Sequence, residues 1–93
     1  MTLEELMQDL HALNSELEKY ENKYNLLSAY FYKLYEMGVL EENDDYLKWA
    51  GLYRIKQNRE KKYKEFLPDV LSTIEKKSDI ELELLMDWRR YAA

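Results

Sequence analysis

The feature that most constrains the fold of this chain is a regular spacing of apolar side chains over its first third. Leucine or aromatic residues recur at alternating intervals of three and four at Leu3, Leu6, Leu10, Leu13, Leu17, Tyr20, Tyr24, Leu27, Phe31 and Leu34. This spacing places them on one side of an α-helix that packs along a long seam. Thr2 and Glu5 form a capping box at its start, and Gly38 suits a left-handed C-cap. The pattern predicts one helix over residues 3–37.

A second helix is expected after a short acidic connection. Asn43 and the two aspartates that follow it offer side-chain oxygens for a helix N-terminus. An apolar stripe that includes Tyr46 and Trp49 predicts a helix over residues 44–66. Gly51 costs this helix about 1 kcal/mol relative to alanine, which suggests a close contact with another helix.

Pro68 disfavours a helical conformation at the residue before it and suits the first turn of a new helix. A C-terminal helical segment is therefore expected over residues 69–91, as one helix or as two. With two glycines, one proline and no cysteine among 93 residues, β-rich and disulfide-based folds are excluded. The predicted fold class is all-α, a three- or four-helix bundle in a single domain over residues 1–93, with the first two helices antiparallel.

The expected helix lengths predict self-association. At 1.5 Å per residue the first helix would be roughly 50 Å long and the second about 34 Å, so the second cannot cover the first. Leu3, Leu6 and Leu10 would then stay bare unless the C-terminal segment or a second subunit covers them. Such a patch is typical of an interface, and a homodimer is the expectation.

Charge is distributed unevenly along the chain, whose formal net charge is −5. Residues 1–45 hold 11 acidic and three basic residues, whereas residues 46–67 hold seven basic and two acidic ones. Arg54, Lys61 and Lys64 lie on one side of the second helix and form a basic face. This face either pairs with the acidic first helix or docks on an acidic partner or on phosphates, and nucleic acid is the less favoured partner.

Tyrosine is unusually frequent, with nine residues in the chain. Tyr30, Tyr32 and Tyr35 form the densest group, and Trp88 lies beside two arginines near the C-terminus. Tyrosine offers a large apolar face and a hydroxyl group that keeps a hydrogen-bond partner at a wet interface. These four aromatic residues either belong to the core or bind a protein partner.

The residues required for most kinds of catalysis are missing from the sequence. His11 is the only histidine, no Glu-x-x-His pair is present, and the acidic run at 41–45 is followed by Tyr46 where a calcium loop needs glycine. The few serine and threonine residues suit helix starts better than a nucleophilic triad. No catalytic, metal-binding or cofactor-binding residue is predicted, and we do not expect an enzyme.

The run from Leu3 through Glu4, Glu5 and Leu6 to Leu17 resembles the first helix of the small all-α chorismate mutases. The resemblance implies a long first helix with two shorter ones in an interlocked dimer. Such enzymes hold a dianionic substrate with arginines of the first helix. Here Met7 follows Leu6, the second arginine position falls near Lys23 and Tyr24, and the first helix contains no arginine.

The sequence therefore predicts a small protein–protein interaction module, such as an adaptor, a regulatory subunit or an inhibitor, that self-associates. The alternatives are a nucleic-acid-associated factor that uses the basic face and, third, a chorismate-mutase-like enzyme. No apolar run approaches the roughly 18 residues that span a bilayer, and the acidic start lacks a signal-peptide core. A cytoplasmic protein without membrane contact is the expectation.

Overall fold

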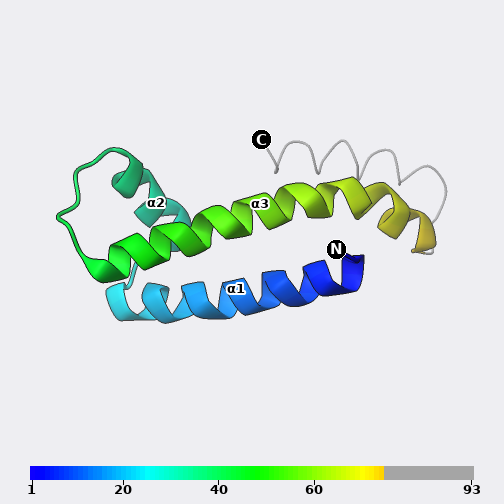
Figure 1. The fold of residues 1–93 in the computed structure, drawn as a ribbon, viewed down its shortest axis with the longest axis horizontal. Coiled ribbons are helices and arrows are strands. Elements are labelled where there is room, and N and C mark those ends of the chain that lie inside the picture. The colour runs from blue at the N-terminus through cyan, green and yellow to red at the C-terminus, as the bar shows by residue number, and fades with distance from the viewer. Residues whose placement is uncertain (75–93) are drawn as a thin grey trace. The chain divides into compact units, whose positions relative to one another are not determined.

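The computed structural model describes residues 1–74, and all of their regular structure is helical (Figure 1). The helices are α1 (Leu3–Tyr24), α2 (Ser28–Glu36) and α3 (Asp44–Thr73). The predicted all-α class is confirmed. The chain divides into two compact units, the first spanning Met1–Tyr63 and the second beginning at Lys64. Most of the C-terminal segment predicted over 69–91 lies outside the described residues, and the single domain over 1–93 stays a prediction.

Within the first unit, α1 and α3 lie side by side and run antiparallel, as expected (Figure 1). Tyr24 at the end of α1 bonds to Asp45 at the start of α3, and Asp9 near the start of α1 pairs with Arg59. The short helix α2 packs where the end of α1 meets the start of α3. The first unit is therefore a helical hairpin with a third helix across one end.

The prediction of one helix over residues 3–37 is wrong, because α1 ends at Tyr24 and α2 starts at Ser28. Asn25 adopts the left-handed conformation, with φ 52° and ψ 41°, and its N–H bonds to the Glu21 carbonyl. Asparagine tolerates this conformation better than most residues. If α1 continued straight, the residues after Tyr24 would extend beyond the start of α3 and would not pack against it. The turn at Asn25 instead folds α2 back, and Ser28 and Phe31 become buried.

The predicted end of the second helix at residue 66 is also wrong, because α3 continues through Pro68 to Thr73. A proline ring fixes φ near the helical value and removes a single N–H donor, so it disfavours a helix without forbidding one. Gly51 shows no close helix contact either. No described atom outside its own helix lies within 4 Å of the position that its Cβ would occupy.

With these boundaries, helix length no longer predicts a homodimer. The 22 residues of α1 and the 30 residues of α3 correspond to about 33 Å and about 45 Å, so α1 is the shorter helix. Leu6 and Leu10 are buried within a single chain, and Leu3 is partly buried. Leu6 and Leu10 are therefore not part of the exposed patch that the sequence had predicted. Self-association itself stays a prediction.

The core of the first unit is built around Trp49, which is fully buried. Its ring stacks on Phe31 with centroids 3.8 Å apart and an interplanar angle of 3°. Tyr20 and Tyr24 of α1 stack on it as well, each with a centroid distance of 5.7 Å. Aromatic pairs of this kind contribute about 0.5–1.5 kcal/mol each beyond the area that they bury. The indole of α3 therefore packs against both α1 and α2.

A chain of hydrogen bonds runs beside these rings and joins all three helices. Trp49 Nε1 donates to Ser28 Oγ over 2.9 Å, and Ser28 Oγ donates to Glu21 Oε2 over 2.7 Å. The Ser28 backbone N–H donates to the same carboxylate oxygen over 2.8 Å. Leu27 at the N-cap provides no side-chain hydrogen bond, so the Glu21 carboxylate from α1 caps α2 instead.

The substitution Ser28→Ala is expected to lower the free energy of unfolding by about 1–3 kcal/mol, because it leaves the buried Trp49 indole N–H without an acceptor. Urea unfolding followed by circular dichroism measures the change. Ser15→Ala, at an exposed position of α1, is the matched control and should change stability by less than about 0.5 kcal/mol. Equal effects of the two substitutions would contradict a structural role for the Ser28 hydroxyl.

Candidate interaction surface

The structure brings two of the predicted groups of residues together on α2 and α3. Arg54 Nε donates a hydrogen bond to the Tyr32 hydroxyl over 2.8 Å. The guanidinium carbon lies 5.7 Å from the ring centroid of Tyr32 and 5.8 Å from that of Tyr35. Tyr53 packs on Tyr32 with a centroid distance of 5.0 Å. We call these four residues the tyrosine–arginine cluster.

Arg54 forms no ion pair with a carboxylate among residues 1–74, and the charge of Glu36 acts on it only from farther away. The hydrogen bond to Tyr32 raises the pKa of the guanidinium, and burial raises the pKa of Tyr53. Arg54 binds Tyr32 through Nε, and no described residue bonds to its two terminal nitrogens. The aromatic rings thus hold a guanidinium whose terminal nitrogens bond to no described acceptor.

A second surface is the outer face of α2, which we define as Leu27, Tyr30 and Met37. These side chains are 61%, 61% and 69% exposed. Tyr30 and Met37 are seven residues apart and lie on one side of the helix, and Leu27 is the N-cap residue that precedes it. The opposite side carries Ser28 and Phe31, which are buried. Tyr30 is therefore a surface residue, whereas Tyr32 and Tyr35 are partly buried.

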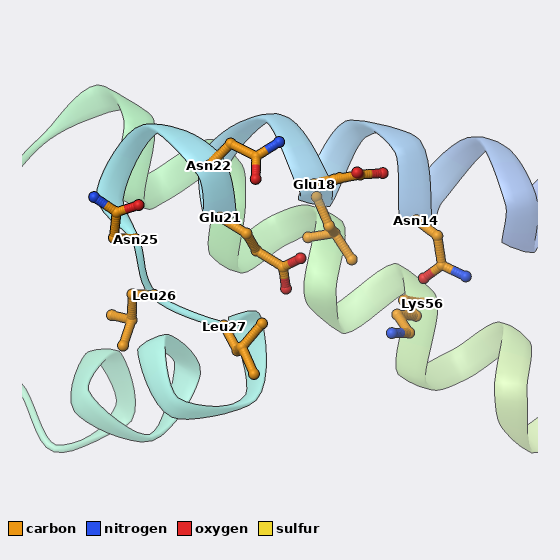
Figure 2. Close-up of a pocket in the computed structure, with 9 residues that line it drawn as sticks. Asn14, Glu18, Glu21, Asn22, Asn25, Leu26, Leu27 and Lys56 are labelled. Carbon is orange, nitrogen blue, oxygen red and sulfur yellow. The ribbon is translucent and has the colours of Figure 1, made fainter.

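A polar groove of about 560 Å³ lies between α1, the link to α2 and the middle of α3 (Figure 2). The Glu21 carboxylate in this groove already accepts from Ser28, and Lys56 Nζ lies 3.8 Å from Glu60. The groove provides carboxylate, carboxamide and ammonium groups, and none of its lining side chains is a nucleophile next to a base. Its lining residues are Asn14, Leu17, Glu18, Glu21, Asn22, Asn25, Leu26, Leu27 and Lys56.

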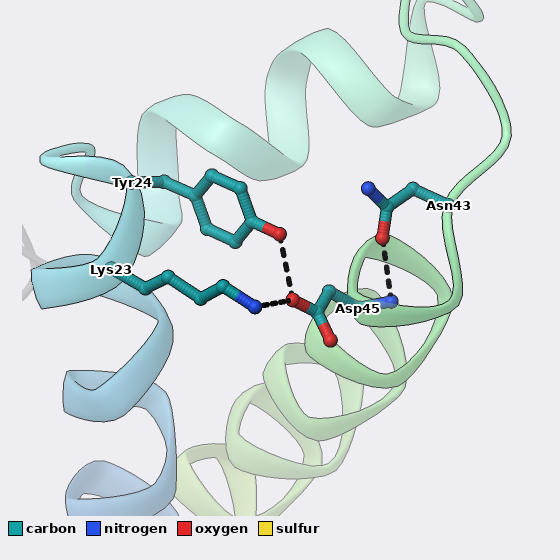
Figure 3. A network of polar contacts seen from close by, with 4 residues as sticks. All are labelled: Lys23, Tyr24, Asn43 and Asp45. Atoms are coloured by element: carbon teal, nitrogen blue, oxygen red, sulfur yellow. Dashed lines mark hydrogen bonds and ion pairs between the residues drawn. The ribbon is translucent and has the colours of Figure 1, made fainter.

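A polar network around Asp45 fixes the end of the hairpin (Figure 3). Lys23 Nζ and the Tyr24 hydroxyl each donate to Asp45 Oδ2 over 2.6 Å. The Asp45 backbone N–H donates to Asn43 Oδ1 over 2.8 Å, which is the expected helix cap. The two donors lower the pKa of the Asp45 carboxyl group, and the same contacts raise the pKa values of Lys23 and Tyr24. These residues hold α1 and α3 in register.

The remaining predicted positions are dispersed. Lys61 is exposed on α3, Lys64 belongs to the second unit, and Trp88 lies outside the described residues. His11 is exposed on α1. Within residues 1–74, no group of three or more histidine, aspartate or glutamate side chains is arranged to hold a metal ion. The basic face of Arg54, Lys61 and Lys64 is thus split between the two units.

Comparisons with protein-family models, with curated protein sequences and with solved structures find no match for this chain. No helix in the part of the chain that the structure describes is both long and apolar enough to cross a lipid bilayer.

Stability is expected to depend on acid through Asp45. The pKa of its carboxyl group is lower in the folded protein than its ordinary value, so its contacts stabilise the fold above that ordinary value. The stabilisation is lost as the pH falls through the folded-state pKa. Asp45→Asn should therefore lower the urea midpoint at about pH 6 and have little effect at about pH 2.

Asp44→Asn is the matched control, because Asp44 is the exposed neighbour at the same helix start. It removes the same charge from the helix N-terminus and leaves the contacts of Lys23 and Tyr24 intact. An effect of Asp45→Asn that stays the same at both pH values would contradict the ion-pair interpretation.

Proposed function

We propose that this protein is a small helical protein–protein interaction module, in the manner of an adaptor, regulatory subunit or inhibitor, without catalytic activity of its own. The observation that supports this proposal is the division of α2 into two faces. Its inner face is fixed to the core through Phe31 and Ser28, while Leu27, Tyr30 and Met37 are more than half exposed. The outer face of α2 is the proposed contact surface.

Large apolar and aromatic side chains on a fixed helix suit protein recognition, because little conformational entropy is lost when a partner binds. Tyrosine and arginine are also the residue types that most often dominate binding energy at interfaces. Two members of the tyrosine–arginine cluster, Tyr32 and Tyr35, lie on the same helix as Tyr30, and the cluster adds the fixed cation of Arg54 from α3. The predicted partner-binding residues Tyr32 and Tyr35 contribute through this cluster.

Self-association is part of the proposal. The surface that we propose for it is the outer face of α2 and no longer the leucines of α1. The nucleic-acid alternative is less favoured, because the Tyr32 ring already packs against Arg54 and Tyr53 and the residues of the basic face belong to two different units. The chorismate-mutase-like activity remains third. Of the positions that such a site would fill with arginine, Met7 carries no charge and Lys23 is paired with Asp45.

The double substitution Leu27→Ala/Tyr30→Ala should remove the partner without unfolding the chain, since both side chains are mostly exposed. Tagged wild type and variant are compared by quantitative mass spectrometry of the proteins that each retains from the native host. At least one protein should be depleted at least tenfold by the variant.

Ile74→Ala, which removes an exposed apolar side chain of the second unit, is the control and should retain that protein. Equal retention by all three forms would contradict the proposed surface. Light scattering that gives a particle of 11.4 kDa at tens of micromolar would exclude self-association.

A further inference from the structure

Besides the outer face of α2, a further exposed surface follows one side of α3 in the first unit. Leu47, Gly51, Arg54, Asn58 and Lys61 recur at intervals of four, three, four and three, so they form one stripe along the helix. Four of the five are exposed and Gly51 is partly exposed, with Leu47 64% exposed. We call these five residues the α3 stripe.

Gly51 is the unusual member of this stripe. A glycine inside a helix lowers its stability by about 1 kcal/mol relative to alanine, so it is expected where a close contact needs it. No described atom beyond its own helix approaches the place of a Cβ at this position, and its φ is not positive. The absence of a side chain therefore serves neither packing nor backbone conformation within the described fold. What it does provide is room for another backbone to approach α3 closely.

The charge of the stripe indicates the chemistry of that approaching segment. Arg54 and Lys61 are one heptad apart, the five positions include no acidic residue, and neither cation has an ion-pair partner among residues 1–74. Tyr32 and Tyr35 hold the Arg54 guanidinium with its terminal nitrogens unused, which suits bidentate binding of a carboxylate. Leu47 adds an apolar anchor one turn before Gly51.

We propose that the α3 stripe docks an acidic amphipathic helix of another protein. The backbone of that helix would cross at Gly51, its carboxylates would bind Arg54 and Lys61, and an apolar side chain would contact Leu47. A second copy of this chain is the less suitable occupant, because the proposed self-association uses the outer face of α2. The inference rests on the proposed function and names the class of partner.

The test uses three synthetic helical peptides of 20 residues that differ only in their polar positions, which are all Glu, all Gln or all Lys. Each is titrated into the full-length ¹⁵N-labelled protein and followed by NMR. The Glu peptide should shift the amide signals of Gly51 and Asn58 at lower concentration than the other two. Its affinity should fall several-fold between about 50 and 300 mM salt.

Three variants and a control locate the site. Arg54→Gln/Lys61→Gln should weaken binding of the Glu peptide at least tenfold. Lys19→Gln, which removes an exposed cation of α1, should leave it unchanged. Gly51→Ala should weaken binding several-fold and raise the thermal midpoint by a few degrees, a combination that a purely structural glycine would not give. Leu27→Ala/Tyr30→Ala should still bind the peptide, so failure here is distinguished from failure of the proposed function.

Several results would overturn the inference. These are equal binding of the Gln peptide, signal changes away from the α3 stripe, or unchanged binding by Gly51→Ala. A single-stranded oligonucleotide of 20 nucleotides that binds the stripe more tightly than the Glu peptide would assign it to nucleic acid. A concentration-dependent shift of the Gly51 signal without any peptide, together with a dimer mass by light scattering, would assign it to a second copy.

Discussion

The hydrogen-bond chain from Trp49 through Ser28 to Glu21 is the interaction on which the arrangement of the first unit depends. With nine residues, α2 is too short to be stable alone in water, because its few backbone hydrogen bonds do not offset the free-energy cost of starting a helix. The hydrogen bonds of Ser28 stabilise α2 at its first residue. The Ser28 hydroxyl accepts the hydrogen bond of the buried Trp49 indole N–H from α3, and the Glu21 carboxylate from α1 caps the N-terminus of α2. Stacking of Phe31 on Trp49 adds the apolar part of the same contact.

The position of α2 in turn determines which side chains face outward. Once Ser28 and Phe31 point to the core, the helical repeat directs Tyr30 to solvent and brings Tyr32 to Arg54. The proposed contact surfaces on α2 and α3 are therefore consequences of one buried contact. The network around Asp45 supports the same geometry from outside the core, since it joins the ends of the two helices that α2 covers.

The sequence predicted helix starts better than helix ends. Thr2 accepts the Glu5 N–H over 3.1 Å at the start of α1, and Asn43 caps α3, because a capping side chain acts on its own neighbours. The end of α1 was missed because the apolar spacing continues unbroken across Asn25. The signals available were Asn25, which tolerates a left-handed conformation, and Ser28, which suits a helix start. The stop expected at Pro68 was wrong because local preference is weaker than the continuity of a long helix.

The same limit applies to the candidate site. Tyr30, Tyr32, Tyr35 and Arg54 could each be named from composition and spacing. Their division into an exposed residue and a cluster could not, because Tyr32 meets Arg54 only after the chain has turned at Asn25. The open space beside Gly51 could not be predicted either, because a sequence shows where a side chain is missing but not whether another helix packs there.

The central claim, that a buried hydrogen bond and a stacked ring fix α2 to the hairpin, is tested most directly by hydrogen exchange. The Trp49 indole N–H and the Ser28 amide N–H are followed by NMR together with amides in the middle of α1 and α3. We expect the indole N–H and the Ser28 amide N–H to exchange as slowly as the most protected of these amides, which means that they open only with the whole first unit. Fast exchange at Ser28 and Trp49, while α1 and α3 stay protected, would contradict it.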